Sequence, residues 1–399
     1  MKIRSITVFA DTAVVEERAR LAELGTFAQT ARQAYVDAAF EVQTTRLALD
    51  GVPALQPDPV RYAVTLEAMA REHGFEYVSL GPAPETILPR LPEMFAATQA
   101  VFATAHIVDP ASGVIDGAAV RGAARVIREA SHIDAGFGNL RFAALAHVLP
   151  GTPFFPAAYH DGGAPAFAVA TEAADLAVAA SQTASDLADA HRRLCDTIEA
   201  EAARLVAVAD RLAAHHAMRF HGIDFSLAPF PTLACSIGAA LEALTGQPLG
   251  AAGSLAAAAT LTDAIGQARF PRVGFCGLML PVLEDTVLAQ RAAEGRLNVG
   301  ELLQWSAVCG TGLDTVPLPG DVSEGALARL LFDVAALAVR LHKPLTARLM
   351  PLPGKVAGDP VHFDFAYFAD GGVLSVDGVA GEGPLERTAT LALHARAQS

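Results

Sequence analysis

Basic residues are scarce in this sequence, and so are cysteine and tryptophan. Its 399 residues include 29 lysines and arginines against 43 aspartates and glutamates, together with four cysteines and one tryptophan. The resulting formal charge of −14 repels phosphate backbones, which disfavours nucleic acid as a partner. The cysteines are scattered without a CxxC pair, so the sequence indicates neither a zinc site nor a disulfide framework.

Long uncharged apolar runs are also lacking. No stretch approaches the roughly 18 residues that cross a bilayer, and the best apolar helix, GALARLLFDVAALAVRL, is interrupted by Arg329, Asp333 and Arg340. The N-terminal MKIRSITVFADTAVVEE has too short an apolar stretch for a signal peptide and instead predicts a strand. We therefore expect a soluble cytoplasmic protein without a membrane partner.

Short apolar runs alternate with helical segments along most of the chain. The runs are nearly continuous in hydrophobicity, which is typical of parallel strands covered on both faces. A long helix is predicted from about Ser185 to Met218, because that stretch holds no glycine or proline. The pattern predicts an α/β fold, and since no linker stands out we expect one domain over residues 1–399. The ten predicted strands are KIRSITVFA, TTRLALD, FEYVSLG, AVFATAHIV, LRFAALAHV, AFAVAT, IDFSLAP, RVGFCGLML, GLDTVPL and PLTARLM.

The segment CGTGLDTVPLPGD, residues 309–321, collects unusual residues between two predicted helices. Asp314 falls in a strand that should be buried, where a carboxylate has to be paired, bound to a metal or protonated. Cys309 follows the end of a helix, whose field disfavours a thiolate. A packed thiol and a catalytic cysteine are therefore alternative interpretations of Cys309. Gly310 is expected to end the preceding helix.

The helices on either side of this segment have recognisable start signals. Asn298 followed by Glu301 matches a capping box for the helix GELLQWSAV. Ser323 or Asp321 is expected to cap the helix that follows.

A proline-rich loop follows one strand in GFGNLRFAALAHVLPGTPFFPAAYHDGG, residues 136–163. Prolines fix the backbone, which suits a loop that holds a defined geometry. One interpretation is a rigid structural turn with His160 on the surface. The other is a loop that lines a pocket, in which His160 or Asn139 touches a ligand.

Two adjacent carboxylates, Glu284 and Asp285, end the apolar segment GFCGLMLPVLEDT. Ligands bind at the carboxyl ends of strands in parallel α/β folds. Asp285 is therefore interpreted either as the cap of the next helix or, with Glu284, as an acid, base or metal ligand.

Three basic residues lie in or beside the predicted strand of LHKPLTARLMPLPGKVAGD. Arg348 lies inside the strand, where a buried guanidinium needs a carboxylate or a phosphate as partner. It is expected either to pair with a structural aspartate such as Asp314 or Asp333, or to hold an anionic substrate together with Lys343 or Lys355.

These segments together resemble a known family. FGNLRFAALAHVLPGTPFFPAAYH, LPVLED, CGTGLDTVPLPGD and TARLMPLPGKVAGD are similar, in this order, to the blocks of the uncharacterised family called domain of unknown function 711. The resemblance implies a ten-stranded α/β barrel like that of pyruvate formate-lyase and other glycyl radical enzymes, with the segment around Cys309 in its interior. No glycyl radical is expected, because the end DGVAGEGPLERTATLALHARAQS lacks the RVxGY-like motif. FDFAYFADGG replaces a glycine-rich segment of the family and predicts a more aromatic pocket wall.

We expect an enzyme that acts on a small anionic metabolite, such as an amino or keto acid, by lyase, hydrolase or isomerase chemistry. Arg348 and Lys343 would hold the anion, and Asp314, Asp285 or His160 would move protons. The alternative is a ligand-binding or regulatory protein without turnover. Catalysis requires Asp314 and Glu284 or Asp285 to meet Arg348 in one cavity. The sequence leaves any cofactor unknown and leaves open a divalent cation and a homo-oligomer.

Overall fold

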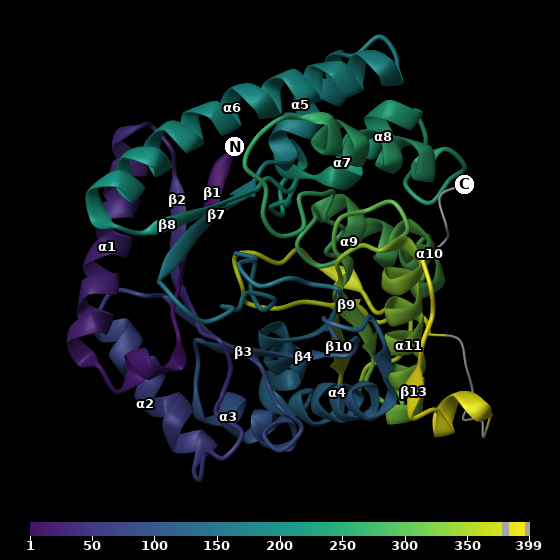
Figure 1. Cartoon of the computed structure of the whole chain (residues 1–399). Coiled ribbons are helices and arrows are strands. Elements are labelled where there is room, and N and C mark those ends of the chain that lie inside the picture. The colour runs from purple at the N-terminus through teal and green to yellow at the C-terminus, as the bar shows by residue number, and fades with distance from the viewer. Residues whose placement is uncertain (377–382, 396–399) are drawn as a thin grey trace.

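The computed structural model describes residues 1–376 and 383–395, so part of the C-terminal segment in which we expect no radical motif lies outside the described residues. Nine strands form one sheet in the order β8-β7-β1-β2-β3-β4-β6-β10-β9. The sheet curves around a central space into which loops project (Figure 1). The strands are β1 Lys2–Phe9, β2 Val42–Ala48, β3 Tyr77–Pro82, β4 Val101–His106, β6 Phe142–Ala146, β7 Ala166–Glu172, β8 Arg219–Asp224, β9 Gly312–Pro319 and β10 Leu345–Leu352.

The sheet consists of parallel sets that run in opposite directions. β1, β2, β3, β4 and β6 are parallel to one another. β7 is antiparallel to β1, and β10 is antiparallel to β6, while β8 and β9 run parallel to β7 and β10. Every residue of β7 and β10 is buried, as expected for strands covered on both faces. The α/β class is confirmed.

The predicted closed barrel of ten strands is not confirmed, because the regular sheet is open between β8 and β9. The segment RVGFCGLML, predicted as a strand, is irregular. Together with Pro281, which follows it directly, the segment makes single parallel bridges to both sides of the opening. These bridges join Ile223 to Arg272, Leu227 to Leu278, and Pro281 to Asp314.

Left-handed backbone explains why this segment is not a regular strand. Gly274 has φ 75° and Cys276 has φ 43°, both far from the extended conformation. The carboxylate of Asp224, at the end of β8, takes the place of ladder partners and accepts hydrogen bonds from the N–H groups of Phe275 (2.7 Å) and Cys276 (2.8 Å). Burial raises the pKa of Asp224 to about 6, although these bonds favour its charged form.

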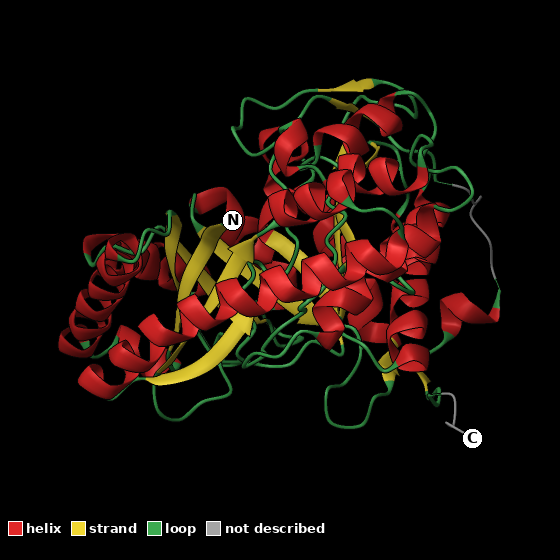
Figure 2. Ribbon diagram, turned by 90° about the horizontal axis from the view of Figure 1, so that it is seen from above, coloured by secondary structure: helices red, strands yellow, loops and turns green. Residues whose placement is uncertain are grey.

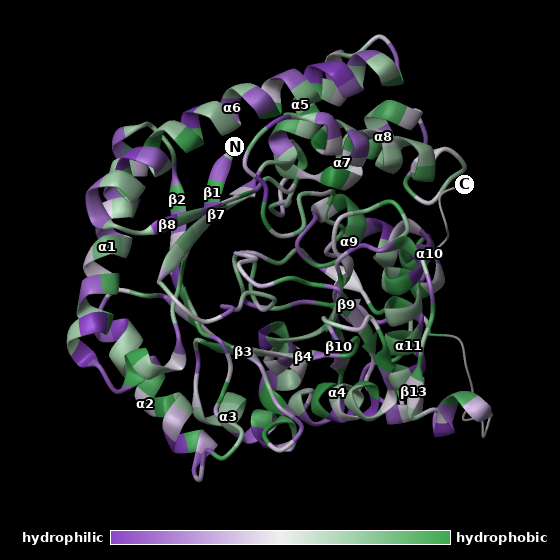
Figure 3. Ribbon diagram, in the orientation of Figure 1, coloured by the Kyte–Doolittle hydropathy of each residue, from purple (hydrophilic) through white to green (hydrophobic). Residues whose placement is uncertain are grey.

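Helices cover the outer face of the sheet (Figure 2). The predicted long helix is α6, whose buried residues recur every three or four positions, so that one stripe packs inward. Figure 3 shows polar and apolar residues alternating along it. Among the described residues, no helix is long and apolar enough to cross a membrane. The helices are α1 Arg18–Asp37, α2 Pro59–Glu72, α3 Leu91–Ala97, α4 Gly117–Ala130, α5 Ala174–Thr183, α6 Leu187–His216, α7 Ile237–Thr245, α8 Ser254–Gln267, α9 Thr286–Ala293, α10 Val299–Trp305 and α11 Glu324–Leu341.

The residues that start two of the helices were predicted correctly from the sequence. The capping box between Asn298 and Glu301 is present at the start of α10. Ser323, and not Asp321, caps α11, because its side chain accepts a hydrogen bond from the N–H of Ala326.

Gly310 has a different role from the predicted one. Gly310 lies beyond the end of α10 at Trp305. Its backbone packs against Gly277 of the irregular segment, and a Cβ on Gly310 would lie 2.6 Å from the Cα of Gly277. The close approach of two backbones, and not helix termination, explains the glycine.

We expect Gly310→Ala to lower the free energy of unfolding by about 1–3 kcal/mol. The new methyl group would meet backbone atoms of Gly277 and Leu278, which cannot move aside as a flexible side chain can. Gly266→Ala is the matched control, since a Cβ at this α8 position meets nothing within 4 Å and alanine favours the helix. Urea unfolding of both variants measures the difference. Equal stability of the two variants would show that the contact between Gly310 and Gly277 is not tight.

Candidate functional site

A cavity lies within the curve of the sheet. Its volume is about 90 Å³. Strand residues, the loop after β6 and the segment after β11 (Pro360–Val361) all contribute to its wall. The polar residues of the wall are Arg4, Gln43, Thr44, Arg46, Glu284, Thr311, Asp314, Thr346 and Arg348.

Glu284 connects two strands that lie far apart in the sheet. Its carboxylate accepts hydrogen bonds from Arg4 of β1 and from Nη2 of Arg348 of β10, the latter at 2.7 Å. The residue is only 5% exposed. Burial opposes its charged form, but the two guanidinium groups outweigh burial and lower the pKa of Glu284. Glu284 is therefore a stable anion of the wall.

Asp314 also binds Arg348, but its pKa is shifted in the direction opposite to that of Glu284. Nε of Arg348 donates to its Oδ1 at 2.6 Å. Burial raises the pKa of Asp314, Arg348 counteracts this in part, and the charge of Glu284 adds to the rise. Two neighbouring carboxyl groups with opposite pKa shifts are typical of sites that move protons.

A β-bulge places Asp314 opposite Arg348. Leu313 pairs with Ala347 and Val316 with Leu349, so two residues of β9 oppose one residue of β10. Thr315, the second residue of the bulge, has φ 40°, which is unfavourable for a β-branched side chain. Bulges of this kind change the direction of a side chain next to a site.

Arg46 of β2 is a buried cation without a carboxylate partner in residues 1–376 and 383–395. It is 7% exposed, and its Nε donates to Oγ1 of Thr44 at 2.8 Å. The guanidinium carbon lies 5.5 Å from the ring centroid of Tyr77 and 5.1 Å from that of Phe155. Burial and the neighbouring charge of Arg4 lower the pKa of Arg46 to about 10. The side chain is still a cation at neutral pH.

A hydroxyl group adds to the unpartnered polar groups of the wall. Oγ1 of Thr311 is buried and makes no hydrogen bond within the described part of the chain. Buried polar groups usually have a partner, so this hydroxyl is an exception among the residues of the wall.

Of the predicted catalytic residues, Asp314 and Glu284 lie together with Arg348 in the cavity wall. Asp285 lies outside this wall. Asp285 is fully buried and caps two helices. Its oxygens accept hydrogen bonds from the N–H groups of Val287 (2.9 Å) in α9 and Ile237 (2.5 Å) in α7. The capping interpretation of Asp285 is therefore the one that the structure shows.

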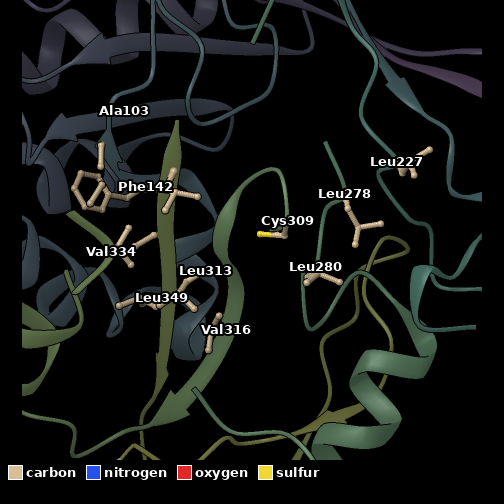
Figure 4. Packing of buried hydrophobic residues seen from close by; sticks show 14 of the residues in the cluster. Ala103, Phe142, Leu227, Leu278, Leu280, Cys309, Leu313, Val316, Val334 and Leu349 are labelled. Atoms are coloured by element: carbon tan, nitrogen blue, oxygen red, sulfur yellow. The ribbon is translucent and has the colours of Figure 1, made fainter. Parts of the chain in front are cut away.

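His160 and Cys309 lie outside the cavity wall. His160 is 1% exposed, so its placement on the surface was wrong, and it lies near Phe9, with ring centroids 6.3 Å apart. Cys309 packs in the main apolar cluster, and Figure 4 shows its sulfur pointing toward the strand that carries Leu313 and Val316. Its Sγ accepts a hydrogen bond from the N–H of Gly312 at 3.4 Å.

The other predicted binding residues also contact protein groups outside the cavity. Nζ of Lys343 donates to the carbonyls of Ser306 (2.9 Å), Ala307 (3.3 Å) and Cys309, at the end of α10. Asn139 is buried and donates to the carbonyl of Ile127 at 3.0 Å. Lys355 lies in the turn after β10, where its carbonyl accepts from the N–H of Gly320.

The more aromatic wall expected from FDFAYFADGG is confirmed, because Phe365 and Tyr367 of that segment line the cavity. Sequence reasoning missed Arg4 and Arg46. The signal for both arginines was present, because each lies inside an apolar predicted strand, KIRSITVFA or TTRLALD. The argument applied to Arg348, that a buried guanidinium needs an anionic partner, holds for them equally. The loop after β6 does line the cavity, through Phe154 and Phe155 and not through His160.

The described residues contain no group of three or more histidine, cysteine, aspartate or glutamate side chains that could hold a metal ion. The two carboxylates of the wall are bound by arginines. The site is organised around charge pairs.

Comparison with known proteins gives the family. The family model described as Uncharacterised ACR (DUF711) matches residues 1–367. The chain belongs to the DUF711 family. It is similar to the UPF0210 proteins of Pyrobaculum arsenaticum (34% identity, covering 75% of this chain and 70% of the relative), Pyrobaculum islandicum (32%, covering 80% and 75%) and Methanopyrus kandleri (32%, covering 74% and 69%).

We expect the two cavity arginines of this DUF711 protein to differ in their effect on stability. Arg348→Met leaves Asp314 without its cation and removes one partner of Glu284, so unfolding should become easier by about 3–5 kcal/mol. Arg46→Met removes a buried cation that forms no ion pair with a described carboxylate, so stability should change by less than about 1 kcal/mol or should rise. Denaturant unfolding of both variants measures this. A loss at Arg46 as large as that at Arg348 would make Arg46 a structural residue.

The raised pKa of Asp314 predicts a pH dependence of stability. Folding favours its protonated form, so this contribution is fully present below the ordinary pKa of 3.8 and is lost as the pH rises through the folded value. Asp314→Asn keeps an acceptor for Arg348 but cannot lose a proton. The variant should therefore gain stability relative to the wild type as the pH rises from 3 toward neutrality. Parallel stability profiles for the two proteins would contradict the raised pKa.

Proposed function

We propose that this DUF711 protein is an enzyme that acts on a small anionic metabolite by polar, non-radical chemistry. The observation that carries the proposal is the guanidinium of Arg46, which lines the cavity without a carboxylate partner among the described residues. Arg4 and Arg348 each contact two carboxylates, and both contact Glu284. A bound anion would give Arg46 the partner that the fold gives the other two arginines.

Asp314 is proposed as the proton-transferring group. It lines the same cavity as Arg46, and burial raises its pKa above the ordinary value, a shift in the direction that favours a role in acid–base catalysis. Arg348 is then a positioning residue, because its Nε fixes the direction of the Asp314 carboxyl group. A protein that only binds a ligand needs the cation but has no use for a protonatable carboxyl group beside it. This supports the enzyme over the regulatory alternative, with lyase, isomerase or hydrolase chemistry.

The proposed anion site differs from the one expected from sequence. Arg348 was expected to hold the substrate with Lys343 or Lys355. The guanidinium of Arg348, however, already binds Asp314 and Glu284. Lys343 is occupied by three carbonyl groups. Arg46 takes over the role.

We also propose that the irregular segment at residues 272–281 acts as a tenth strand that closes a barrel around the cavity. Its single bridges to both open edges and the two opposed sets of strands support this arrangement. The four cysteines are free, which supports a reducing, cytoplasmic location.

The proposal is tested by screening carboxylates, with pyruvate, alanine and acetate as first probes, for thermal stabilisation and turnover. Arg46→Gln should abolish the stabilisation given by any carboxylate that protects the wild type. Asp314→Asn should lose turnover, whereas Cys309→Ser, a change in the apolar core, should keep activity within a few-fold. Full protection of the folded Arg46→Gln variant would refute the anion site. An inactive Cys309→Ser variant with a rapidly labelled Cys309 in the wild type would assign catalysis to the thiol.

A further inference from the structure

We infer that the anion taken by this cavity is an aryl carboxylate, in which the carboxylate is attached to an aromatic ring directly or through a short chain. The inference rests on the proposed anion site at Arg46 and adds the chemical class of the rest of the ligand. It follows from the wall that faces Arg46, from the charges already paired inside the cavity, and from its size.

Aromatic side chains form a large part of the cavity wall. Two edge-to-face contacts connect three of them: the ring centroids of Tyr77 and Phe102 are 5.3 Å apart at 74°, and those of Phe102 and Phe155 are 5.3 Å apart at 67°. A planar ring can join such a cluster through the same edge-to-face or offset geometry. The aromatic residues of the wall are Tyr77, Phe102, Phe154, Phe155, Phe275, Phe365 and Tyr367.

Arg46 lies at the boundary between the charged and the aromatic parts of the wall. Its guanidinium lies over the rings of both Tyr77 and Phe155. A carboxylate that binds Arg46 therefore brings the remainder of its molecule close to these rings.

The paired charges argue against a second charge on the ligand. A dicarboxylate would need another free cation, but Arg4 contacts Glu172 and Glu284, and Arg348 contacts Glu284 and Asp314. An ammonium group would need a free carboxylate, but both carboxylates of the wall are paired: Glu284 binds Arg4 and Arg348, and Asp314 binds Arg348. The part of the ligand beyond its carboxylate should therefore be uncharged, because a second charge there would be buried without a partner.

The size of the cavity agrees with this class. The cavity is small, at about 90 Å³, which favours a compact carboxylate with a single ring.

The segment between β11 and β12 (Gly371–Gly372) supplies part of the aromatic wall and is held by contacts of its own. The ring of Phe365 packs edge-to-face against Phe137, with centroids 5.1 Å apart. The ring of Tyr367 packs against Phe230 and lies 5.2 Å from the guanidinium carbon of Arg4. These contacts order the two rings before a ligand binds, which favours discrimination between ligands.

The experiment compares binding of benzoate, cyclohexanecarboxylate and acetate by isothermal titration calorimetry. Benzoate should bind the wild type about ten-fold tighter than acetate and clearly tighter than cyclohexanecarboxylate, which matches it in size but lacks the π-system. Phe365→Leu and Tyr367→Leu should each reduce the preference for benzoate several-fold and leave acetate binding unchanged. Phe363→Leu is the matched control, because Phe363 belongs to the same segment and packs on Phe137 outside the cavity wall.

The outcomes separate this inference from the proposed function. Acetate and benzoate binding equally, both lost in Arg46→Gln, would overturn the aryl class and leave the anion site intact. Equal binding of cyclohexanecarboxylate and benzoate would also overturn it, because the wall would then select apolar ligands in general. Carboxylate binding that survives Arg46→Gln would overturn the proposed anion site and this inference together. The wild-type comparison stands even where a leucine variant fails to fold.

Discussion

The pairing of buried charges around Glu284 is the constraint on which the rest of the cavity depends. Its carboxylate is bound by Arg4 of β1 and Arg348 of β10, and Arg4 also binds Glu172 of β7. These strands are not neighbours in the sheet, except for β1 and β7. Because an unpaired charge in this environment costs several kcal/mol, the pairs fix the distance between opposite sides of a sheet that its regular hydrogen bonds leave open.

Because buried charges in this cavity are otherwise paired, the guanidinium of Arg46, unpaired within the described chain, is informative. Arg46 is as buried as Arg348, yet no carboxylate in the described residues neutralises it. Aromatic rings and the hydroxyl of Thr44 give it weaker partners. Proteins tolerate such unfavourable groups mainly where function requires them. The bulge at Thr315, with its left-handed backbone, is a second local cost beside the same cavity.

The sequence predicted most of the fold because its signals are local. Continuous apolar runs identified the strands, the spacing of apolar residues identified α6, and the capping box of Asn298 marked the start of α10. The segment at residues 272–280 is equally apolar, but Asp224 and the left-handed Gly274 and Cys276 prevent a regular ladder. That arrangement depends on contacts across about 50 positions of the chain, which apolar periodicity does not record.

The site was predicted in part for a related reason. A buried guanidinium demands a partner, so the grouping of Arg348 with Asp314 was foreseeable, and Glu284 was a candidate at the end of an apolar segment. Which of several buried polar residues reach one cavity depends on the curvature of the sheet and on the bulge in β9, and neither can be read from residue types. Lys343 and Asn139 satisfy carbonyl groups for the same reason: their tertiary surroundings decide their role.

The central claim, that Arg46 is the free cation of an otherwise compensated cavity, is tested most directly with a monatomic anion. Crystals soaked in bromide and measured at the bromine absorption edge would locate anion sites without assuming any ligand class. The account predicts a bromide beside the guanidinium of Arg46, and none at Arg4 or Arg348, whose carboxylate partners repel anions. Bromide at Arg348 in place of Asp314, or a cavity without bromide while exposed surface arginines bind it, would contradict the account.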